Sequence, residues 1–220
     1  TYPYKLYNLG GIIVNLEMSL LSLLIFLLFG ENFPVFFASL MFFLVGIIFA
    51  AVNGIPMRMG MLDNDGCNAL NLSSHQDIMR CLWLQLKINA LITKGTRLRD
   101  MPDELFPELS EEERKKGLCA VIGVFACNRA MDGMDFPLAE RLAKELLESS
   151  GIVPLHRYIL TAELIYCELV GENRREVLDG YRSSEFQRFE KAMKAFPSLI
   201  RTQYACELLV NSDESSSQRK

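Results

Sequence analysis

The hydrophobic pattern divides the chain into an apolar N-terminal part and a charged remainder. Two long apolar spans come first: Leu9 to Phe29, interrupted only by Asn15 and Glu17, and the uncharged run Asn32 to Met57. A span of roughly 20 apolar residues is long enough to cross a hydrocarbon core. Because residues 31–34 form a short connection with a proline, the two spans are predicted to form an antiparallel transmembrane hairpin.

Beyond residue 70 the apolar positions recur at the spacing of amphipathic helices. The pattern predicts helices over residues 76–94, 110–131, 135–149, 154–170, 183–195 and 198–210, with glycine, proline and capping residues between them. No alternating pattern typical of strands competes. The expected fold class is therefore all-α, with a two-helix transmembrane hairpin in residues 1–70, a soluble helical domain in 71–210 and a disordered tail in 211–220.

One pair of predicted helices in the soluble part carries the small residues of a helical repeat. Ala126 lies on the first helix, residues 134–136 form the turn, and Ala139 and Leu146 lie on the second helix. This arrangement is similar to a tetratricopeptide (TPR) hairpin, so the domain is described as TPR-like. An irregular helical bundle without a ligand groove explains the same pattern.

Charged residues support the same division and suggest a location. The first 60 residues hold four charged side chains, Lys5, Glu17, Glu31 and Arg58, so the net charge of −4 belongs to residues 61–220. This acidic balance gives no basic footprint for nucleic acid, and no nucleic-acid partner is expected. Lys5 and Arg58 flank the hairpin, which by the positive-inside bias predicts an integral membrane protein with its C-terminal domain in the cytoplasm. Six widely spaced cysteines without a C-x-x-C pair agree with a reducing compartment.

The residues after the second span carry the candidate chemistry. Asn53-Gly54-Ile55-Pro56 ends the apolar run, and Asp65-Gly66 follows. Glycine and proline permit irregular backbone at the membrane boundary, and a carboxylate can be the third zinc ligand beside two imidazoles and a water. A helix C-cap followed by a polar surface turn accounts for the same residues. An EF-hand does not, because the sixth position counted from Asp63 is Asn68 rather than glycine.

Taken together, these residues resemble the Asn-x-x-Pro and Asp-Gly signature of the site-2 protease family, which are intramembrane zinc metalloproteases. Residues 10–16 resemble that family's Gly-x-x-x-Asn element, and residues 53–70 resemble a bacterial subgroup with a cytoplasmic helical tail. The resemblance implies a zinc-dependent endopeptidase that cleaves a membrane-bound peptide or protein. It also implies that Asp65 is a metal ligand, that Asn53 and Pro56 form the substrate-binding edge, and that zinc is the cofactor of the full-length protein.

The sequence departs from this family in two respects. The gap from Pro56 to Asp65 is longer than in the usual motif. The family's His-Glu-x-x-His, in which both histidines bind zinc and the glutamate activates water, is absent. The two histidines, His75 and His156, are far apart and each falls in a predicted helix of the soluble region. The missing pair is therefore expected upstream of Thr1, and this chain alone is expected to be inactive.

Two hypotheses of function remain. The first is the membrane-embedded part of a site-2 protease-like zinc endopeptidase. A variant of this hypothesis is that the helical domain regulates the access of substrates to the protease. The second is a non-catalytic membrane-anchored adaptor, in which the hairpin tethers a helical domain that binds a cytoplasmic protein partner. A soluble hydrolase or nucleotide enzyme is disfavoured, because the chain has no Ser-His-Asp or Cys-His constellation and no glycine-rich phosphate loop.

Overall fold

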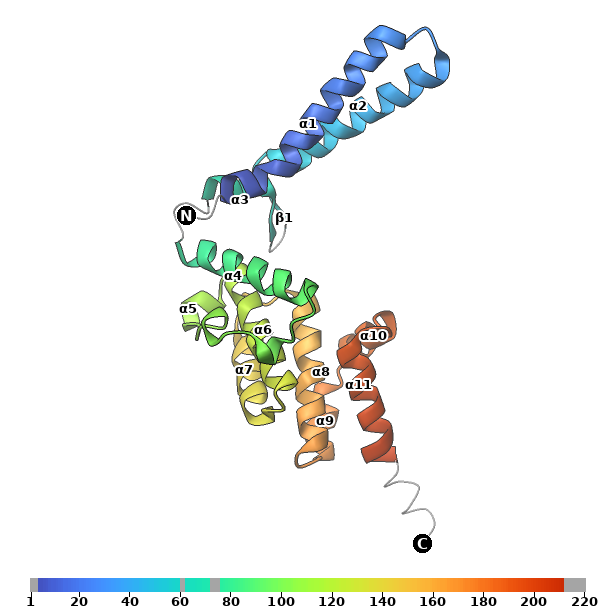
Figure 1. The fold of residues 1–220 in the computed structure, drawn as a ribbon. Helices are drawn as coiled ribbons and strands as arrows, with labels where there is room; N and C mark the ends of the chain where they lie inside the picture. The colour runs from blue at the N-terminus through green and yellow to red at the C-terminus, as the bar shows by residue number, and fades with distance from the viewer. Residues whose placement is uncertain (1–3, 60–61, 72–75, 212–220) are drawn as a thin grey trace. The chain divides into compact units, whose positions relative to one another are not determined.

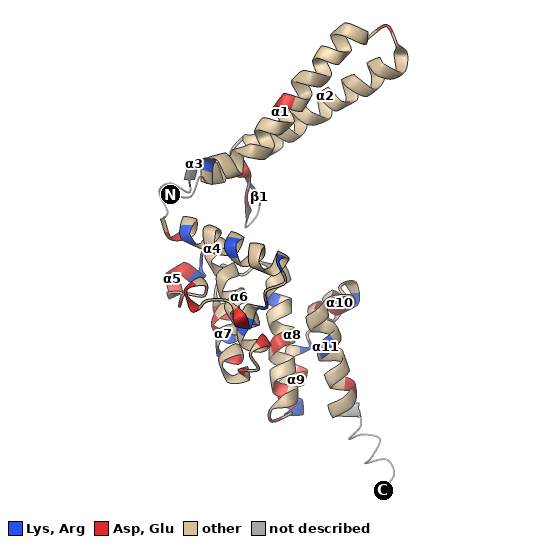
Figure 2. Cartoon of the chain, in the orientation of Figure 1, with Lys and Arg blue, Asp and Glu red and all other residues tan. Residues whose placement is uncertain are grey.

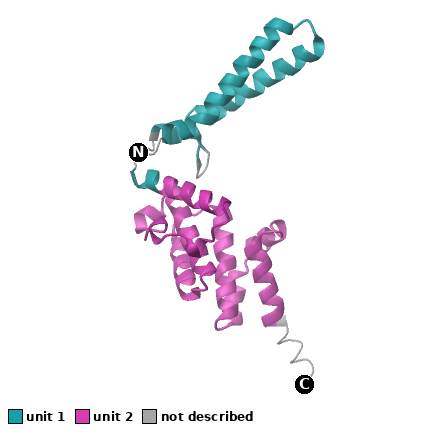
Figure 3. Ribbon diagram, viewed as in Figure 1, with its two compact units in different colours: residues 1–80 teal, residues 81–220 magenta. Residues whose placement is uncertain are grey.

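The computed structural model of the chain describes residues 4–59, 62–71 and 76–211. It divides into two compact units, residues 1–80 and 81–220, which are described separately (Figure 3). The predicted fold class is confirmed, because two apolar helices precede a helical domain (Figure 1) and the strands found in the described residues are only two residues long. Most of the predicted tail, residues 212–220, lies outside the described residues, as does His75.

Helices α1 (Tyr4–Phe29) and α2 (Phe33–Gly54) form the predicted hairpin (Figure 1). Both are long and apolar enough to cross a membrane. Asn32 caps α2, since its side-chain Oδ1 accepts a hydrogen bond from the Val35 amide at 3.5 Å. Pro34 occupies the first turn, where the missing amide hydrogen costs nothing. Most of the large apolar side chains of both helices are exposed, as expected where lipid rather than protein covers them.

The two helices approach closely at small residues. A Cβ atom added to Gly46 of α2 would overlap the hydroxyl of Ser19 on α1. Ser19 is fully buried, and its hydroxyl donates to the Asn15 carbonyl at 2.7 Å. Small residues and locally satisfied hydroxyls are typical of helix contacts in membranes, where close backbone packing replaces hydrophobic driving force.

The second unit is helical and follows most of the predicted elements. Its elements are α4 (Gln76–Thr93, which begins in the first unit), the short 3-10 turns η2 (Leu98–Asp100) and η3 (Asp103–Leu105), α5 (Glu111–Arg114), α6 (Gly117–Asp132), α7 (Phe136–Glu148), α8 (Pro154–Val170), α9 (Arg175–Tyr181), α10 (Ser184–Ala192), α11 (Pro197–Cys206) and a π-helical turn η4 (Glu207–Asn211). Helices α6, α7 and α8 are joined by short turns and pack together. The TPR-like character of the α6–α7 pair stays a prediction.

The single helix predicted for residues 110–131 was wrong, because the structure splits it into α5 and α6. Ser110 and Glu113 form the predicted capping box, but helix α5 ends after Arg114. The Ser149 hydroxyl donates to the Arg114 carbonyl at 2.6 Å, and a Cβ atom at Gly151 would overlap that carbonyl oxygen. The turn between α7 and α8 therefore occupies the position that a continuous helix would need.

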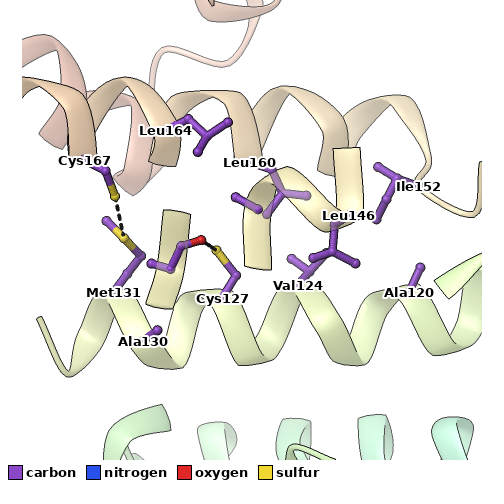
Figure 4. Close-up of a cluster of buried hydrophobic side chains, with 12 residues drawn as sticks. Ala120, Val124, Cys127, Ala130, Met131, Leu146, Ile152, Leu160, Leu164 and Cys167 are labelled. Atoms are coloured by element: carbon purple, nitrogen blue, oxygen red, sulfur yellow. Dashed lines mark hydrogen bonds between the residues drawn. The ribbon is translucent and has the colours of Figure 1, made fainter. Parts of the chain in front are cut away.

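The core of the second unit lies between α6, α7 and α8 (Figure 4). Leu146 and Leu160 are almost completely buried there, and the thiol of Cys167 lies 3.6 Å from the Met131 sulfur. Burial raises the pKa of the Cys167 thiol to about 11 and that of Cys127 further, so neither thiol forms a reactive thiolate at neutral pH. None of the six cysteines forms a disulfide with another residue that the structure describes.

A second cluster joins α8 to α10 and α11 around the buried residues Ile165, Phe186 and Leu199. Next to it, the buried carboxylate of Glu163 on α8 pairs with Arg201 on α11. The Arg201 guanidinium also lies 4.2 Å from the centre of the Tyr166 ring. These contacts attach the C-terminal helix to the rest of the domain.

The end of α8 gives a testable pH dependence. Glu168 accepts hydrogen bonds from the Arg174 backbone amide at 2.9 Å, from its Nε at 3.0 Å and from its Nη2 at 2.8 Å. These bonds lower the pKa of Glu168 from 4.5 to about 2. Because the folded pKa is depressed, this stabilisation is complete above about pH 4.5 and is lost as the pH falls towards 2.

We therefore expect Glu168→Gln to lower the free energy of unfolding at neutral pH by about 1–2 kcal/mol, a value reduced because Arg174 is half exposed and water screens the pair. The difference from wild type should shrink in acid. Urea unfolding followed by circular dichroism at neutral and acid pH measures it. Glu148→Gln, at an exposed position on α7, is the matched control. A difference that stays constant with pH would contradict the assignment.

Candidate functional site

The chain turns back on itself after α2. Strands β1 (Arg58–Met59) and β2 (Leu62–Asp63) form a minimal antiparallel pair in which Arg58 lies opposite Asp63. The Arg58 Nε donates to the Asp63 carboxylate at 2.8 Å, and this partner raises the pKa of Arg58. Helix α3 (Asp65–Asn71) follows and packs against α1 and α2. The chain reversal therefore places Asp65 and Gly66 beside the end of the hairpin.

Asn64 stabilises this reversal of the chain. Its side chain is buried, and its Nδ2 donates to the carbonyl oxygens of Val52 at 2.8 Å and Ile55 at 2.6 Å. Its Oδ1 accepts from the backbone amides of Met57 and Cys67, both at 3.0 Å. One amide side chain has two donor hydrogens and one oxygen with two lone pairs, so all of its capacity is used. Asn64 therefore joins the last turn of α2, the extended segment after it and the start of α3.

Gly66 brings the Asp-Gly pair into backbone contact with α2. A Cβ atom at this position would overlap the carbonyl oxygen of Gly54 and lie 3.2 Å from that of Asn53. Gly54 in turn faces the buried Ile12 of α1, whose Cγ2 is 3.3 Å from where a Gly54 Cβ would be. Only glycine fits at position 66, and the contact fixes α3 against the hairpin.

The three predicted site residues are placed differently. Asp65 is half-buried in the first turn of α3, and its carboxylate makes no hydrogen bond or ion pair with any residue that the structure describes. Asn53 is half-buried in the last turn of α2, so the Gly54–Gly66 contact brings its backbone near Asp65. Pro56 is exposed in the extended segment that follows. The structure therefore groups Asn53 with Asp65 and leaves Pro56 on the outside.

The described residues do not by themselves fit a zinc ion. Within residues 4–59, 62–71 and 76–211, no three His, Cys, Asp or Glu side chains are grouped to hold a metal. Asp65 is a suitable single ligand because its carboxylate is unpaired, but a zinc site needs further nitrogen or sulfur ligands. His156 lies in the second unit on α8, where burial lowers its pKa.

Sequence reasoning assigned no role to Asn64. An asparagine between two aspartates has the composition of a surface turn, and nothing in the pattern indicates that its side chain is buried. The surface-turn interpretation of residues 63–66 was wrong, because the Asn64 side chain is buried and helix α3 begins at Asp65. Asn53-Gly54 was interpreted as a helix C-cap; α2 does end at Gly54, but its C-cap is Ile55.

The second unit contains a groove that sequence reasoning also missed. We call it the arginine groove; it has a volume of about 450 Å³ and lies between residues 99–109 and helices α6 and α7. Its apolar surface includes Phe106, Leu138 and Leu142. The other lining residues are Arg99, Pro107, Glu108, Leu109, Arg114, Gly123, Ala126, Arg129, Ala130, Gly133, Asp135, Arg141, Glu145 and Leu146.

The arginines of this groove have unequal roles. Arg129 is structural, because it donates to the carbonyl oxygens of Leu98 and Met101 and lies 4.8 Å from the Phe106 ring centre. Arg114 and Arg141 share one carboxylate, that of Glu145, at 3.3 and 3.1 Å. The lining as a whole holds four arginines against three acids, Glu108, Asp135 and Glu145, so a net charge of one positive unit lies beside the apolar surface.

Comparisons of the chain with protein-family models, with curated proteins and with solved structures found no match. Similarity to known proteins therefore assigns neither a fold nor an activity to this chain. Its two candidate sites are the end of the hairpin that Asn64 stabilises and the arginine groove.

Proposed function

We propose that this chain is the carboxylate-bearing membrane part of a zinc-dependent endopeptidase of the site-2 protease type. Asp65 would contribute one metal ligand, and the substrate would be a membrane-bound protein or peptide. The observation that carries the proposal is the position of Asp65: Asn64 and Gly66 hold an unpaired carboxylate against the last turn of an apolar helix.

Two features of the Asp65 carboxylate suit a metal ligand. Asp65 lies in the first turn of α3, and no described cation pairs with its carboxylate. A carboxylate without a partner is available to bind a metal cation. A metal ligand also needs an orientation fixed by its surroundings, which the fully hydrogen-bonded Asn64 next to it supplies. The remaining ligands, and any group that activates water, would come from residues outside the described part of the chain.

The outer side of the same segment suits the proposed substrate edge. Ile55, Pro56 and Met57 are exposed, and the backbone at Ile55 is extended. Asn64 fixes this segment from the inside through the Ile55 carbonyl and the Met57 amide, so its side chains project from a rigid support. We propose that a substrate peptide lies along this edge and that the second unit faces the cytoplasm.

The direct test is to measure zinc content and proteolysis of the full-length protein with Asp65→Asn. Loss of both supports the proposal, whereas unchanged zinc and cleavage would remove Asp65 from the metal site. Carboxylate to amide is close to isosteric, so the substitution changes the ligand without changing the packing.

The arginine groove favours a second candidate function, that of a membrane-anchored adaptor. It offers a positive charge from Arg114 and Arg141 next to an apolar surface from Phe106 and Leu142. A peptide with an acidic residue beside a large apolar residue matches both features. Such a peptide would belong to a cytoplasmic partner protein.

We expect a peptide selected from a displayed random library to show this acidic–apolar pattern and to lose at least ~10-fold in affinity with Leu142→Glu, because the new charge repels the peptide's acid and removes apolar contact. Leu155→Glu, at an exposed position of α8 outside the groove, should leave the affinity unchanged. Fluorescence polarisation measures both. Selected peptides that bind both variants equally would exclude the groove.

A further inference from the structure

Helix α4 carries a basic and aromatic face that neither proposed site uses. Arg80, Trp83 and Lys87 are all exposed, and at 100° per residue they fall within roughly one-sixth of the helix circumference. Lys94, also exposed, follows directly after the last residue of the helix. The side of α4 turned away from this set is buried through Cys81, Leu82 and Ile88. We call the exposed set, with Lys94, the basic face.

The charges of the basic face are not neutralised. Arg80, Lys87 and Lys94 form no ion pair with any residue in the described ranges. The one acidic residue of α4, Asp77, lies three residues before Arg80, about 60° away around the helix, and is outnumbered by the cations of the basic face. Residues 95–220 hold 18 lysines and arginines against 22 acids, so α4 is a cationic segment in an otherwise acidic region; Figure 2 shows the blue positions along it.

Trp83 gives the basic face the character of a membrane-interface helix. It is 37% exposed, and the Lys87 ammonium lies 4.6 Å from its ring centre. An exposed tryptophan is costly in water, but its amphipathic ring is favoured at the headgroup level of a bilayer. Met79 and Leu86, both only partly buried, extend the apolar surface beside it. A helix with lysine and arginine next to tryptophan and aliphatic side chains matches the composition of segments that lie in the membrane interface.

The chain tethers the basic face to the hairpin. Helix α2 ends at Gly54 and α4 begins at Gln76, so 21 residues connect them. Even fully extended, such a connection spans at most roughly 70 Å, and α3 shortens it. A membrane-crossing hairpin therefore holds α4 at a high effective concentration near the headgroups.

We propose that the basic face of α4 binds the surface of anionic phospholipids next to the transmembrane hairpin. Each lysine or arginine near an anionic surface strengthens association about fivefold, so three cations give roughly 100-fold. Trp83 would insert its ring among the headgroups. The proposal rests on the two membrane-crossing helices and not on the protease assignment, so it stands or fails independently of Asp65.

The single tryptophan of the 220 residues allows a direct test. The whole chain is reconstituted in vesicles of neutral phosphatidylcholine, or of the same lipid with roughly one-third phosphatidylglycerol, and the Trp83 fluorescence is quenched with brominated lipid. We expect strong quenching and a blue-shifted emission in the anionic vesicles, both reduced in neutral vesicles and by high salt. The combined variant Arg80→Gln, Lys87→Gln and Lys94→Gln should behave in anionic vesicles as wild type does in neutral ones.

The control removes the same charge elsewhere. Arg188→Gln, Lys191→Gln and Lys194→Gln change three exposed cations at α10 and just after it, and should leave the quenching unchanged. Equal quenching in neutral and anionic vesicles, or equal loss with the control variant, would overturn the proposal. So would a Trp83 that neither brominated lipid nor aqueous iodide can reach, because a protein partner would then cover the face.

Discussion

Asp65→Asn is expected to lower the zinc affinity of the full-length protein by ~100-fold or more. Removing a residue that only orients a metal ligand already lowers metal affinity by roughly 10- to 100-fold, and Asp65 is proposed to be a ligand itself. Proteolysis should fall with it. The amide has nearly the shape of the carboxylate, and Gly66 and Asn64 still fix the backbone on either side. Elemental analysis of the purified protein gives zinc content, and cleavage of labelled casein in detergent gives activity.

Asp63→Asn is the matched control. It makes the same chemical change two residues away, at a carboxylate that already has a partner in Arg58 at 2.8 Å. The Arg58 side chain of that pair is 73% exposed and water screens it, so the variant should keep its fold, its zinc and its activity. If the two variants lose zinc equally, or if neither does, Asp65 has no special role and the adaptor hypothesis gains.

Asn64→Ala is expected to loosen the end of the hairpin. The substitution removes two donors and two acceptor positions at once and leaves the Val52 and Ile55 carbonyls and the Met57 and Cys67 amides without that partner. At about 1 kcal/mol per hydrogen bond, the local opening free energy should fall by about 3–4 kcal/mol. Hydrogen exchange of the Met57 and Cys67 amides in detergent should therefore accelerate by ~100-fold or more.

Asn68→Ala provides the comparison for this prediction. Asn68 lies in α3, which begins directly after Asn64, but its side chain makes one long hydrogen bond, 3.3 Å to the Asp63 carbonyl. Exchange of the same two amides should change by only a few fold, since one weak bond contributes less than about 1 kcal/mol. Similar acceleration in both variants would show that general fraying, and not the Asn64 bonds, controls the segment.

The sequence predicts the helices of this fold better than their interruptions. The uncharged run of α2 and the capping box at Ser110 are local signals, so the hairpin and the start of α5 follow from them. The break between α5 and α6 depends on Ser149 and Gly151, which are distant in sequence and contact Arg114 only in the folded domain. No local pattern contains that information.

The candidate site could likewise be predicted only in part from the sequence. Asn53, Pro56 and Asp65 could be selected by their spacing, but the spacing does not say that Pro56 is exposed or that Asp65 is unpaired. The role of Asn64 arises from four backbone groups in three segments, which become neighbours only after the chain reverses direction. The arginine groove likewise needs residues 99–109 to fold over α6 and α7 before it exists.

The tight contact between Gly46 and Ser19 also restricts the route of any helical substrate. Backbones that approach this closely leave no passage between α1 and α2 at that level, and parting them would expose the buried Ser19 hydroxyl to lipid. At this level a third helix could therefore pack only on the outer surface of the hairpin.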